Sequence, residues 1–357
     1  MTKRINREDG LPYLTPEQME QGLDDSDAKI YRLVQASALT HRNPFHNKFM
    51  KEIPWDSEEY AVVPNDPRWI LPKTFDLGAH EWYQGLPEDQ QIDLGMHRFA
   101  QVARVGSEFE HALVAGIMQN NMWVPSNSLN KLYTSQESEE ELRHIQMFDE
   151  MIKRIGVKVH GAPEWFRYAS MGVGPVARLA PVAFWSIVLA GEEPIDHTQK
   201  SLLKLAQKGD AEFHPMFQHV MEWHVAEEAR HISYADNYTK ETVAKLGPWE
   251  KKLLKKSLPY TLLIGANTML RPSAASLKDM GIPQWVADDV WWGSEHGRQS
   301  LQDLFTDTKK RAIELDILDE AGWIQCGLME PNPEARRSKP SIPARAVGNL
   351  LRFSKIL

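Results

Sequence analysis

The chain has 357 residues and a formal net charge of -8 at pH 7. This acidic balance argues against a general nucleic-acid-binding protein, because such proteins need a basic surface for the phosphates. The single cysteine, Cys326, excludes an intrachain disulfide, a cysteine-based zinc site and an iron–sulfur cluster.

The amino-terminal segment carries few signals of regular structure. Prolines punctuate residues 1–85, which predicts an irregular extension with short helices, packed on the rest of the chain. The first residues are basic but lack an apolar stretch, so we expect no signal peptide. The most apolar run, residues 177–191, is shorter than the roughly 20 residues of a membrane span and predicts a buried helix. With the lone cysteine, these features indicate a cytoplasmic protein.

Four long helices are predicted after this extension. Proline, glycine and charge patterns place them at residues 87–122, 135–156, 175–208 and 215–246. Further helices are expected around residues 249–270, 283–293 and 295–318, and no alternating strand pattern stands out. Residues 86–320 therefore predict an all-α domain. Residues 321–357 form a basic tail, which we expect to wrap its own subunit or a dimer partner, with a membrane contact as the alternative.

One short pattern occurs twice, on the second and the fourth predicted helix. Residues 140–144 and 227–231 both read Glu-Glu-x-Arg-His. Residues three apart share a helix face, so each copy directs a carboxylate and an imidazole toward the same point. His224 precedes Glu228 by four residues and His231 by seven, which places all three within about 60° around the helix. With carboxylates from the other two helices, these groups predict a two-iron site in a ferritin-like four-helix bundle.

The expected metal ligands come from all four long helices: Glu110, Glu141, His144, Glu192, His224, Glu228 and His231. On the first helix, Glu110 is preferred to Glu108 because it lies on the more apolar stripe. On the third helix, Glu192 is preferred to Glu193, although both stripes are apolar and the choice stays open. Pro194 should kink this helix beside the metal. We expect no catalytic residue beyond the ligands and no organic cofactor.

Other polar and aromatic residues are interpreted without a functional role. Residues expected at the surface or in the core are His111, His160, His197, His214 and His219; those expected on a solvated face are Glu137, Glu139 and Asp149. The tryptophan-rich stretch at residues 285–292 is interpreted as packing.

The paired motifs resemble those of bacterial di-iron monooxygenases, in which the first acidic residue orients a ligating histidine. That resemblance assigns this role to Glu140 and Glu227. The pattern His-x-x-x-Glu-x-x-His at residues 224–231 is similar to that of the p-aminobenzoate N-oxygenase family, which uses a third histidine as seventh protein ligand. Phe109 and Glu110 resemble the context of its first ligand.

The resemblance covers residues 85–240 and implies two iron ions, with O2 as co-substrate. In that family a peroxo di-iron(III) species N-oxygenates an aryl amine to hydroxylamine, nitroso and nitro products. C-hydroxylation is the alternative on the same scaffold. Manganese also suits these ligand types. Expected partners are a small amine substrate, a second copy of the chain, and an external reductase or ferredoxin, because the sequence lacks a nucleotide-binding fingerprint.

Three other classes of protein stay open at this point. Iron storage uses the same fold. A radical-generating subunit would need a tyrosine close to one iron, and Tyr133 and Tyr234 lie near the motifs. Metal-dependent hydrolysis also uses carboxylate-bridged metal pairs.

Overall fold

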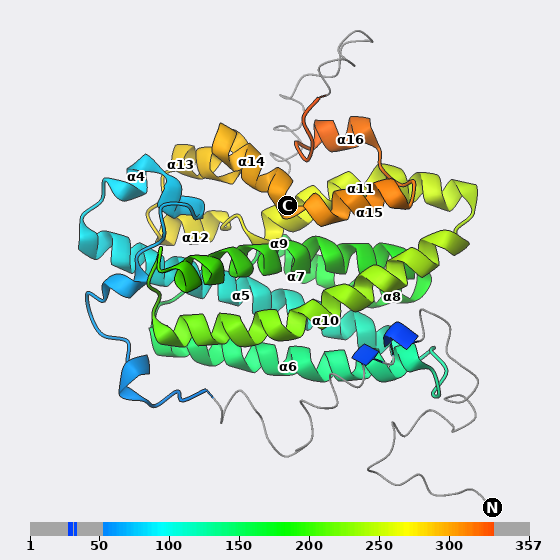
Figure 1. The fold of residues 1–357 in the computed structure, drawn as a ribbon, viewed down its shortest axis with the longest axis horizontal. Coiled ribbons are helices and arrows are strands. Elements are labelled where there is room, and N and C mark those ends of the chain that lie inside the picture. Colours follow the sequence, from blue (N-terminus) through cyan, green and yellow to red (C-terminus); the bar gives the residue numbers. More distant parts are fainter. Residues whose placement is uncertain (1–27, 31, 34–52, 332–357) are drawn as a thin grey trace, which may run out of the picture.

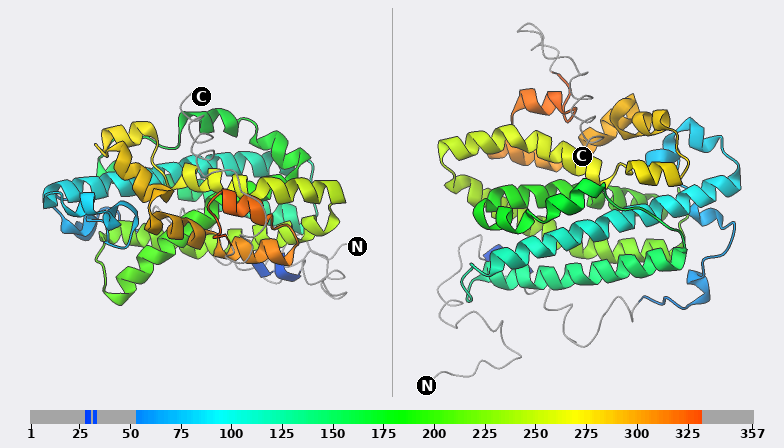
Figure 2. Two further views of the ribbon diagram at one scale, coloured as in Figure 1. Left: turned by 90° about the horizontal axis from the view of Figure 1, so that it is seen from above. Right: turned by 180° about the vertical axis from the view of Figure 1, so that it is seen from behind.

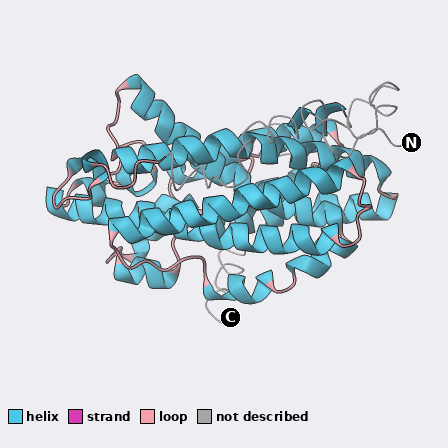
Figure 3. Ribbon diagram, turned by 90° about the horizontal axis from the view of Figure 1, so that it is seen from below, coloured by secondary structure: helices cyan, strands magenta, loops and turns pink. Residues whose placement is uncertain are grey.

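A bundle of four long helices forms the centre of the molecule in the computed structural model, which describes residues 28–30, 32–33 and 53–331 (Figure 1). The four helices are α5 (Glu88–Asn121), α6 (Leu129–Ile155), α9 (Pro181–Lys208) and α10 (Pro215–Lys245). Helix α5 packs along α6 and α9 along α10, while contacts between α6 and α10 and between α5 and α9 close the bundle. Among the described residues there is no β-strand (Figure 3), which confirms the all-α, ferritin-like prediction.

Local sequence signals explain where these helices begin and end. Glu88 and Asp89 in the first turn of α5 are favourable to the helix dipole. Helices α9 and α10 each have a proline at a first-turn position, where the missing backbone donor costs nothing. Gly156 and Gly209 end α6 and α9 in the left-handed conformation, with φ of 77° and 74°, which glycine adopts without steric cost.

Three predicted helix boundaries are wrong. Helix α6 begins at Leu129 rather than residue 135, because Ser135 donates its hydroxyl to the Lys131 carbonyl inside the helix and does not cap it. The predicted helix 175–208 is divided at Ala180 (φ -140°, ψ 63°), since the ring of Pro181 disfavours a helical residue before it. The predicted helix 295–318 is divided at Phe305. Helix α9 continues through Pro194; a bend there stays a prediction.

The remaining helices cover one side of the bundle. Helix α8 (Val173–Leu179) packs on α5 and α9, and α11 (Pro248–Met269) packs on α9 and α5. The later helices lie on the α11 side, away from α6 (Figures 1 and 2). They are α12 (Ala274–Asp279), α13 (Gln284–Asp288), η4 (Asp289–Gly293), α14 (Glu295–Leu304), α15 (Thr306–Glu314) and α16 (Glu320–Gln325); α7 (Glu164–Ser170) precedes α8.

The described part of the amino-terminal extension contains only short helices and packs on the bundle. These are η1 (Glu58–Tyr60), η2 (Pro67–Trp69), η3 (Asp76–Ala79) and α4 (Glu81–Gln84). Trp69 and Tyr83 are buried in one core cluster with Phe99 of α5 and Phe217 of α10. Trp291 of the tryptophan-rich stretch is also buried there, whereas Trp285 is exposed. The predicted tail, residues 321–357, begins within α16, and Trp323 and Leu328 of this part are buried in the core. Residues 332–357 lie outside the described residues, so the predicted role of that part stays a prediction.

A close approach between α5 and α9 depends on one glycine. A Cβ atom at Gly191 would lie 2.3 Å from the Phe109 ring, so only a residue without a side chain leaves the ring in place. Phe109 and Gly191 directly precede Glu110 and Glu192 in sequence. The same contact therefore sets the separation of the two helices that carry these carboxylates.

The apolar run at residues 177–191 spans the end of α8 and the first half of α9. Nine of the fifteen residues in this run are buried, in agreement with the prediction of a buried helix. Among the described residues, no helix is both long and apolar enough to span a membrane.

Candidate metal centre

All seven predicted ligands project into the interior of the four-helix bundle. Helix α5 supplies Glu110, α6 supplies Glu141 and His144, α9 supplies Glu192, and α10 supplies the remaining three. Each of the seven side chains is buried, with Glu192 the most exposed at 6%. An unpaired charge in the protein interior costs several kcal/mol. The negative charge of these four carboxylates must therefore be neutralised by protons or by cations.

Four of these residues form a first possible metal position. The ligand atoms of Glu110, His144, His224 and Glu228 all lie within 4.8 Å of one another. His224 Nε2 is 3.2 Å from Glu110 Oε1 and 3.3 Å from Glu228 Oε1. His144 Nδ1 is 3.4 Å from the same Glu228 oxygen. Two imidazoles and two carboxylates thus face one point.

A second position adjoins the first. Glu141, Glu228 and His231 bring their ligand atoms within 4.8 Å of one another. Glu141 lies between the two motif histidines, with Oε1 2.8 Å from His231 Nδ1 and Oε2 3.2 Å from His144 Nδ1. Glu228 contacts histidines of both positions. Glu141 and Glu228 therefore have the placement of carboxylates that bridge two metals.

The structure separates the two pairs of neighbouring glutamates that the sequence left open. Glu108 points away from the centre: it accepts from the backbone N–H of Ala162 at 3.0 Å and pairs with Arg167 at 2.8 Å. Glu193 pairs with Arg311 at 2.8 Å and accepts a hydrogen bond from Thr308. Both are committed to structural contacts, which leaves Glu110 and Glu192 as the carboxylates that face the centre.

Several ligand atoms are buried without a hydrogen-bond partner, as expected for atoms that bind an ion. They are Glu110 Oε2, both carboxylate oxygens of Glu192 and Glu228 Oε2. Buried polar groups are almost always paired in native proteins. Hard carboxylate oxygens and imidazole nitrogens in this ratio suit iron or manganese, so the residues present fit a pair of such ions.

The electrostatics of the centre are governed by burial and by crowding of like charges. Burial raises the pKa of Glu110 and Glu192 well above the ordinary glutamate value, and neighbouring carboxylates raise both further. Burial opposes ionisation of Glu228 too, but His231 and His224 hold the pKa of Glu228 well below its usual range. Without metal the cluster must hold protons, and bound cations would replace them.

The two motifs orient each other's histidines. His144 Nε2 lies 3.2 Å from Glu227 of the other motif, and His231 Nε2 lies 2.8 Å from Glu140. Arg230 donates to Glu140 at 2.9 Å. Because these carboxylates engage the Nε2 atoms, the Nδ1 atoms are directed at the metal positions. This arrangement agrees with the orienting role expected for Glu140 and Glu227.

Two residues of the centre were missed by sequence reasoning. Gln199 accepts at 2.8 Å from His224 Nδ1, so that Nε2 faces the first position. Its position seven residues after Glu192, on the same helix face, was an available signal. Glu137 was predicted to be solvated, and this is wrong: it is 1% exposed and joins Glu141 and Glu192 in a third group of possible ligands. It lies four residues before Glu141, on the face that turns inward.

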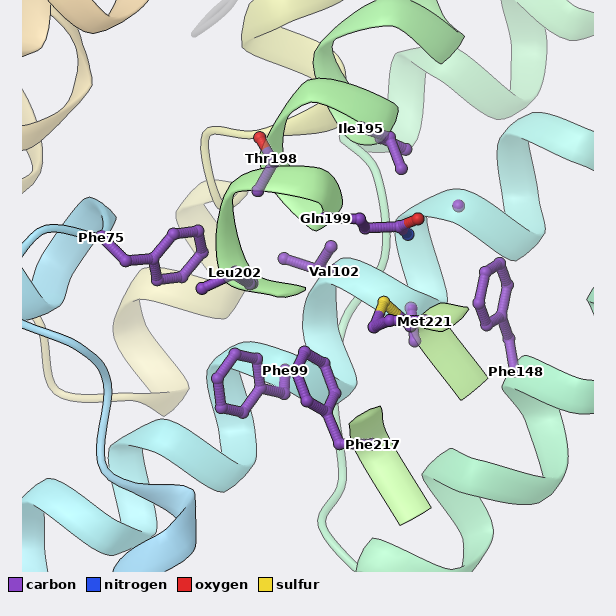
Figure 4. Close-up of a pocket in the computed structure, with 12 residues that line it drawn as sticks. Phe75, Phe99, Val102, Phe148, Ile195, Thr198, Gln199, Leu202, Phe217 and Met221 are labelled. Atoms are coloured by element: carbon purple, nitrogen blue, oxygen red, sulfur yellow. The ribbon is translucent and has the colours of Figure 1, made fainter. Parts of the chain in front are cut away.

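A small apolar cavity adjoins the first position. Its volume is about 20 Å³, enough for one water molecule. Figure 4 shows Met221 and Gln199 between Phe148 and the paired rings of Phe99 and Phe217. Phe148 also packs on His224, with 4.9 Å between ring centroids. None of the twelve lining residues carries a charge, and apart from Thr198 and Gln199 all are apolar.

Comparison with known proteins agrees with the geometry. The model of the family described as P-aminobenzoate N-oxygenase AurF matches residues 24–316. An uncharacterized protein of Mycobacterium bovis is 39% identical over 311 residues, which cover 86% of this chain and 88% of the relative. An uncharacterized protein of Mycobacterium tuberculosis strain H37Rv has the same identity and coverage.

Proposed function

Because the chain belongs to the p-aminobenzoate N-oxygenase family, a family of di-iron oxygenases, we propose that it N-oxygenates an uncharged aromatic amine with O2. The observation that carries this proposal is the third histidine: His224 joins His144, Glu110 and Glu228 at one position. Four carboxylates with three histidines, rather than two, is the ligand set that the resemblance to this family implies.

The proposed ligands would hold two iron ions, with Glu141 and Glu228 close enough to both positions to contact each ion. Glu110, His144 and His224 would complete the first position, and Glu192 and His231 the second. When bound, the iron pair supplies the electrons and the binding site for O2, which no side chain of this centre can provide. Iron is our proposal for both positions, and the ligand types also accommodate manganese.

The surrounding residues hold these ligands in a fixed orientation. Glu227, Glu140 and Gln199 each engage the histidine nitrogen that faces away from the centre. When the imidazole is neutral and carries its proton on that nitrogen, the other nitrogen can bind a cation. Phe148 packs on the ring of His224, and both side chains are buried.

The lining of the cavity supports an uncharged aromatic substrate. Phe99 and Phe217 present ring surfaces, with 4.0 Å between their centroids, and suit offset or edge contacts with another ring. A carboxylate in this cavity would be buried without a cationic partner among the described lining residues, at a cost of several kcal/mol. We therefore propose that the substrate is a neutral arylamine rather than p-aminobenzoate, after which the family is named.

Substrate entry requires the lining side chains to move. The cavity volume of about 20 Å³ is too small for an aromatic ring. Met221 is unbranched and flexible, and it lies between the phenylalanines and Gln199 (Figure 4). We propose that Met221 changes rotamer to admit the ring beside His224.

The electrons for turnover are proposed to come from a separate reductase or ferredoxin. The described residues include no strand that could open a dinucleotide-binding β–turn–α unit. The chain is further proposed to form a homodimer, and to act on a small molecule rather than a polymer.

The test uses the full chain, loaded anaerobically with two equivalents of ferrous iron, then mixed with ¹⁸O2 and a chemical reductant. Aniline, p-toluidine and p-aminobenzoate serve as probes, and products are identified by mass spectrometry. We expect labelled hydroxylamine, nitroso or nitro products from the two neutral amines and much less from p-aminobenzoate. Ring-hydroxylated products would instead support a C-hydroxylase. Continuing iron uptake without any organic product would support storage.

One observation favours a second candidate, a radical-generating protein. Tyr133 and Tyr234 are fully buried and stacked, with 4.3 Å between ring centroids, and the Tyr133 hydroxyl lacks a hydrogen-bond partner. Burial raises the pKa of Tyr133 well above its ordinary value, and Glu137 raises it further. A persistent tyrosyl radical in electron paramagnetic resonance after O2 exposure, lost in Tyr133→Phe, would favour this function over oxygenation.

A further inference from the structure

One buried carboxylate beside the metal centre has no role so far. Glu137 of α6 is 1% exposed, and neither of its oxygens has a hydrogen-bond partner. It brings a carboxylate oxygen within 4.8 Å of ligand atoms of Glu141 and Glu192. Burying a carboxylate in this way is costly, and a purely structural role would leave the cost without compensation.

The position of Glu137 in its helix is equivalent to that of His224. Glu137 precedes Glu141 by four residues and His144 by seven, and His224 precedes Glu228 and His231 by the same steps. Helix α6 therefore reads Glu-x-x-x-Glu-x-x-His where α10 reads His-x-x-x-Glu-x-x-His. Residues at these steps share one helix face. If the α10 face presents three ligands, the α6 face presents three as well.

The two equivalent residues serve opposite positions. His224 faces Glu110 of α5 in the first position, at 3.2 Å. Glu137 lies close to Glu141 and to Glu192 of α9, and Glu192 is the carboxylate that we propose for the second position. In each motif the middle glutamate, Glu141 or Glu228, lies between the two metal positions. The last histidine of the motif faces one position, and its first residue faces the other.

We propose that Glu137 is an eighth protein ligand, bound to the metal that Glu141, Glu192 and His231 hold. This inference rests on the proposed metal pair, and it adds a residue that the expected seven-ligand set does not include. The two metal positions then differ: the first has two imidazoles, and the second has one imidazole and an additional carboxylate.

This difference has a chemical consequence for the cations. With Glu137, five carboxylates face the pair: Glu110, Glu137, Glu141, Glu192 and Glu228. When all five are ionised, their negative charge exceeds the four positive charges of two divalent ions by one, but not the six of two trivalent ions. The extra carboxylate therefore favours the trivalent state, and it favours a hard cation in the second position. Removing it should raise the reduction potential of the pair.

The test measures metal binding rather than turnover. Apo protein is titrated anaerobically with Co²⁺, whose visible absorption changes with coordination number and ligand type. We expect Glu137→Gln, which keeps the shape and removes the charge, to weaken one of the two Co²⁺ sites at least about tenfold, while the other site is retained. Glu139→Gln is the matched control, because Glu139 lies on the same helix with a side chain 53% exposed.

A second variant keeps the inference testable if the first binds poorly overall. Glu137→His gives α6 the same pattern as α10, and we expect it to retain two Co²⁺ ions with an altered absorption spectrum. Glu137→Gln with two wild-type affinities and an unchanged spectrum would overturn the inference. So would loss of both ions in both variants with helical circular dichroism intact, because Glu137 would then act through packing. Failure of the proposed function looks different: wild-type protein would bind two ions and yield no N-oxygenated product.

Discussion

The orientation of His224 by Gln199 gives a quantitative prediction. Gln199 Oε1 accepts from His224 Nδ1 at 2.8 Å, and both side chains are buried. The variant Gln199→Leu nearly keeps the side-chain volume. Metal binding through His224 Nε2 requires the ring proton on Nδ1, and in this variant that N–H has no acceptor. An unsatisfied buried donor costs about 1–3 kcal/mol, which corresponds to a roughly 5- to 150-fold loss of affinity at about 1.4 kcal/mol per factor of ten.

The assay is a competition titration of Fe²⁺ or Co²⁺ against a chelator of known affinity. The loss should appear at one of the two metal sites, the one that contains His224. Gln199→Glu keeps an acceptor for Nδ1 and should bind close to wild type. Thr198→Val serves as the control, because Thr198 lines the same cavity and is not the residue that bonds to His224. Wild-type affinity in Gln199→Leu would refute the argument that Gln199 sets the histidine tautomer.

Four further predictions concern stability. Burial raises the pKa of Glu193 to about 7 from an ordinary 4.5, so between these pH values the folded state holds a proton that the unfolded state has lost. The free energy of unfolding, measured with urea, should therefore fall as pH rises from 4.5 to 7. Glu193→Gln should remove this part of the pH dependence. Arg311→Leu leaves Glu193 and Asp236 without their shared cation and should cost about 3–5 kcal/mol in the same assay, with partial recovery in the Glu193→Gln, Arg311→Leu double variant. Gly191→Ala places a methyl group 2.3 Å from the Phe109 ring and should destabilise by about 1–3 kcal/mol; no change in midpoint would show that the helices separate freely. Adding ferrous iron at 100 times the Kd of each proposed site should stabilise the apo protein by about 2.7 kcal/mol per site in thermal unfolding, and a chelator should reverse this.

The spacing of the motifs was sufficient to predict which helix faces meet. Three- and four-residue steps in a helix are geometric, so Glu141, His144, Glu228 and His231 were placed in the centre by sequence alone. Glu110 and Glu192 stand in no such repeat. They could be chosen only by the polarity of neighbouring residues, and the structure separates them from Glu108 and Glu193 through the cations that pair with the latter two.

Three features were not predicted from the sequence, each for a physical reason: the burial of Glu137, the role of Gln199 and the break at Ala180. Glu137 was taken for a surface residue because glutamate is rarely buried, although its register on α6 already placed it beside Glu141. Gln199 has no distinctive type or motif, and its role depends on how α9 packs against α10. The break at Ala180 followed from the proline after it, but the apolar composition on both sides favoured one continuous helix.

Both metal positions depend on residues far apart in the chain. The first needs Glu110 and Glu228, and the second needs Glu141 and His231, so each combines ligands separated by at least ninety residues. A nascent chain therefore cannot form the first position until residue 228 has left the ribosome, or the second until residue 231 has, and both require α10 to dock on α6. The proposed metal ions would therefore be loaded onto a finished bundle, and a truncated product that lacks α10 would have neither complete site.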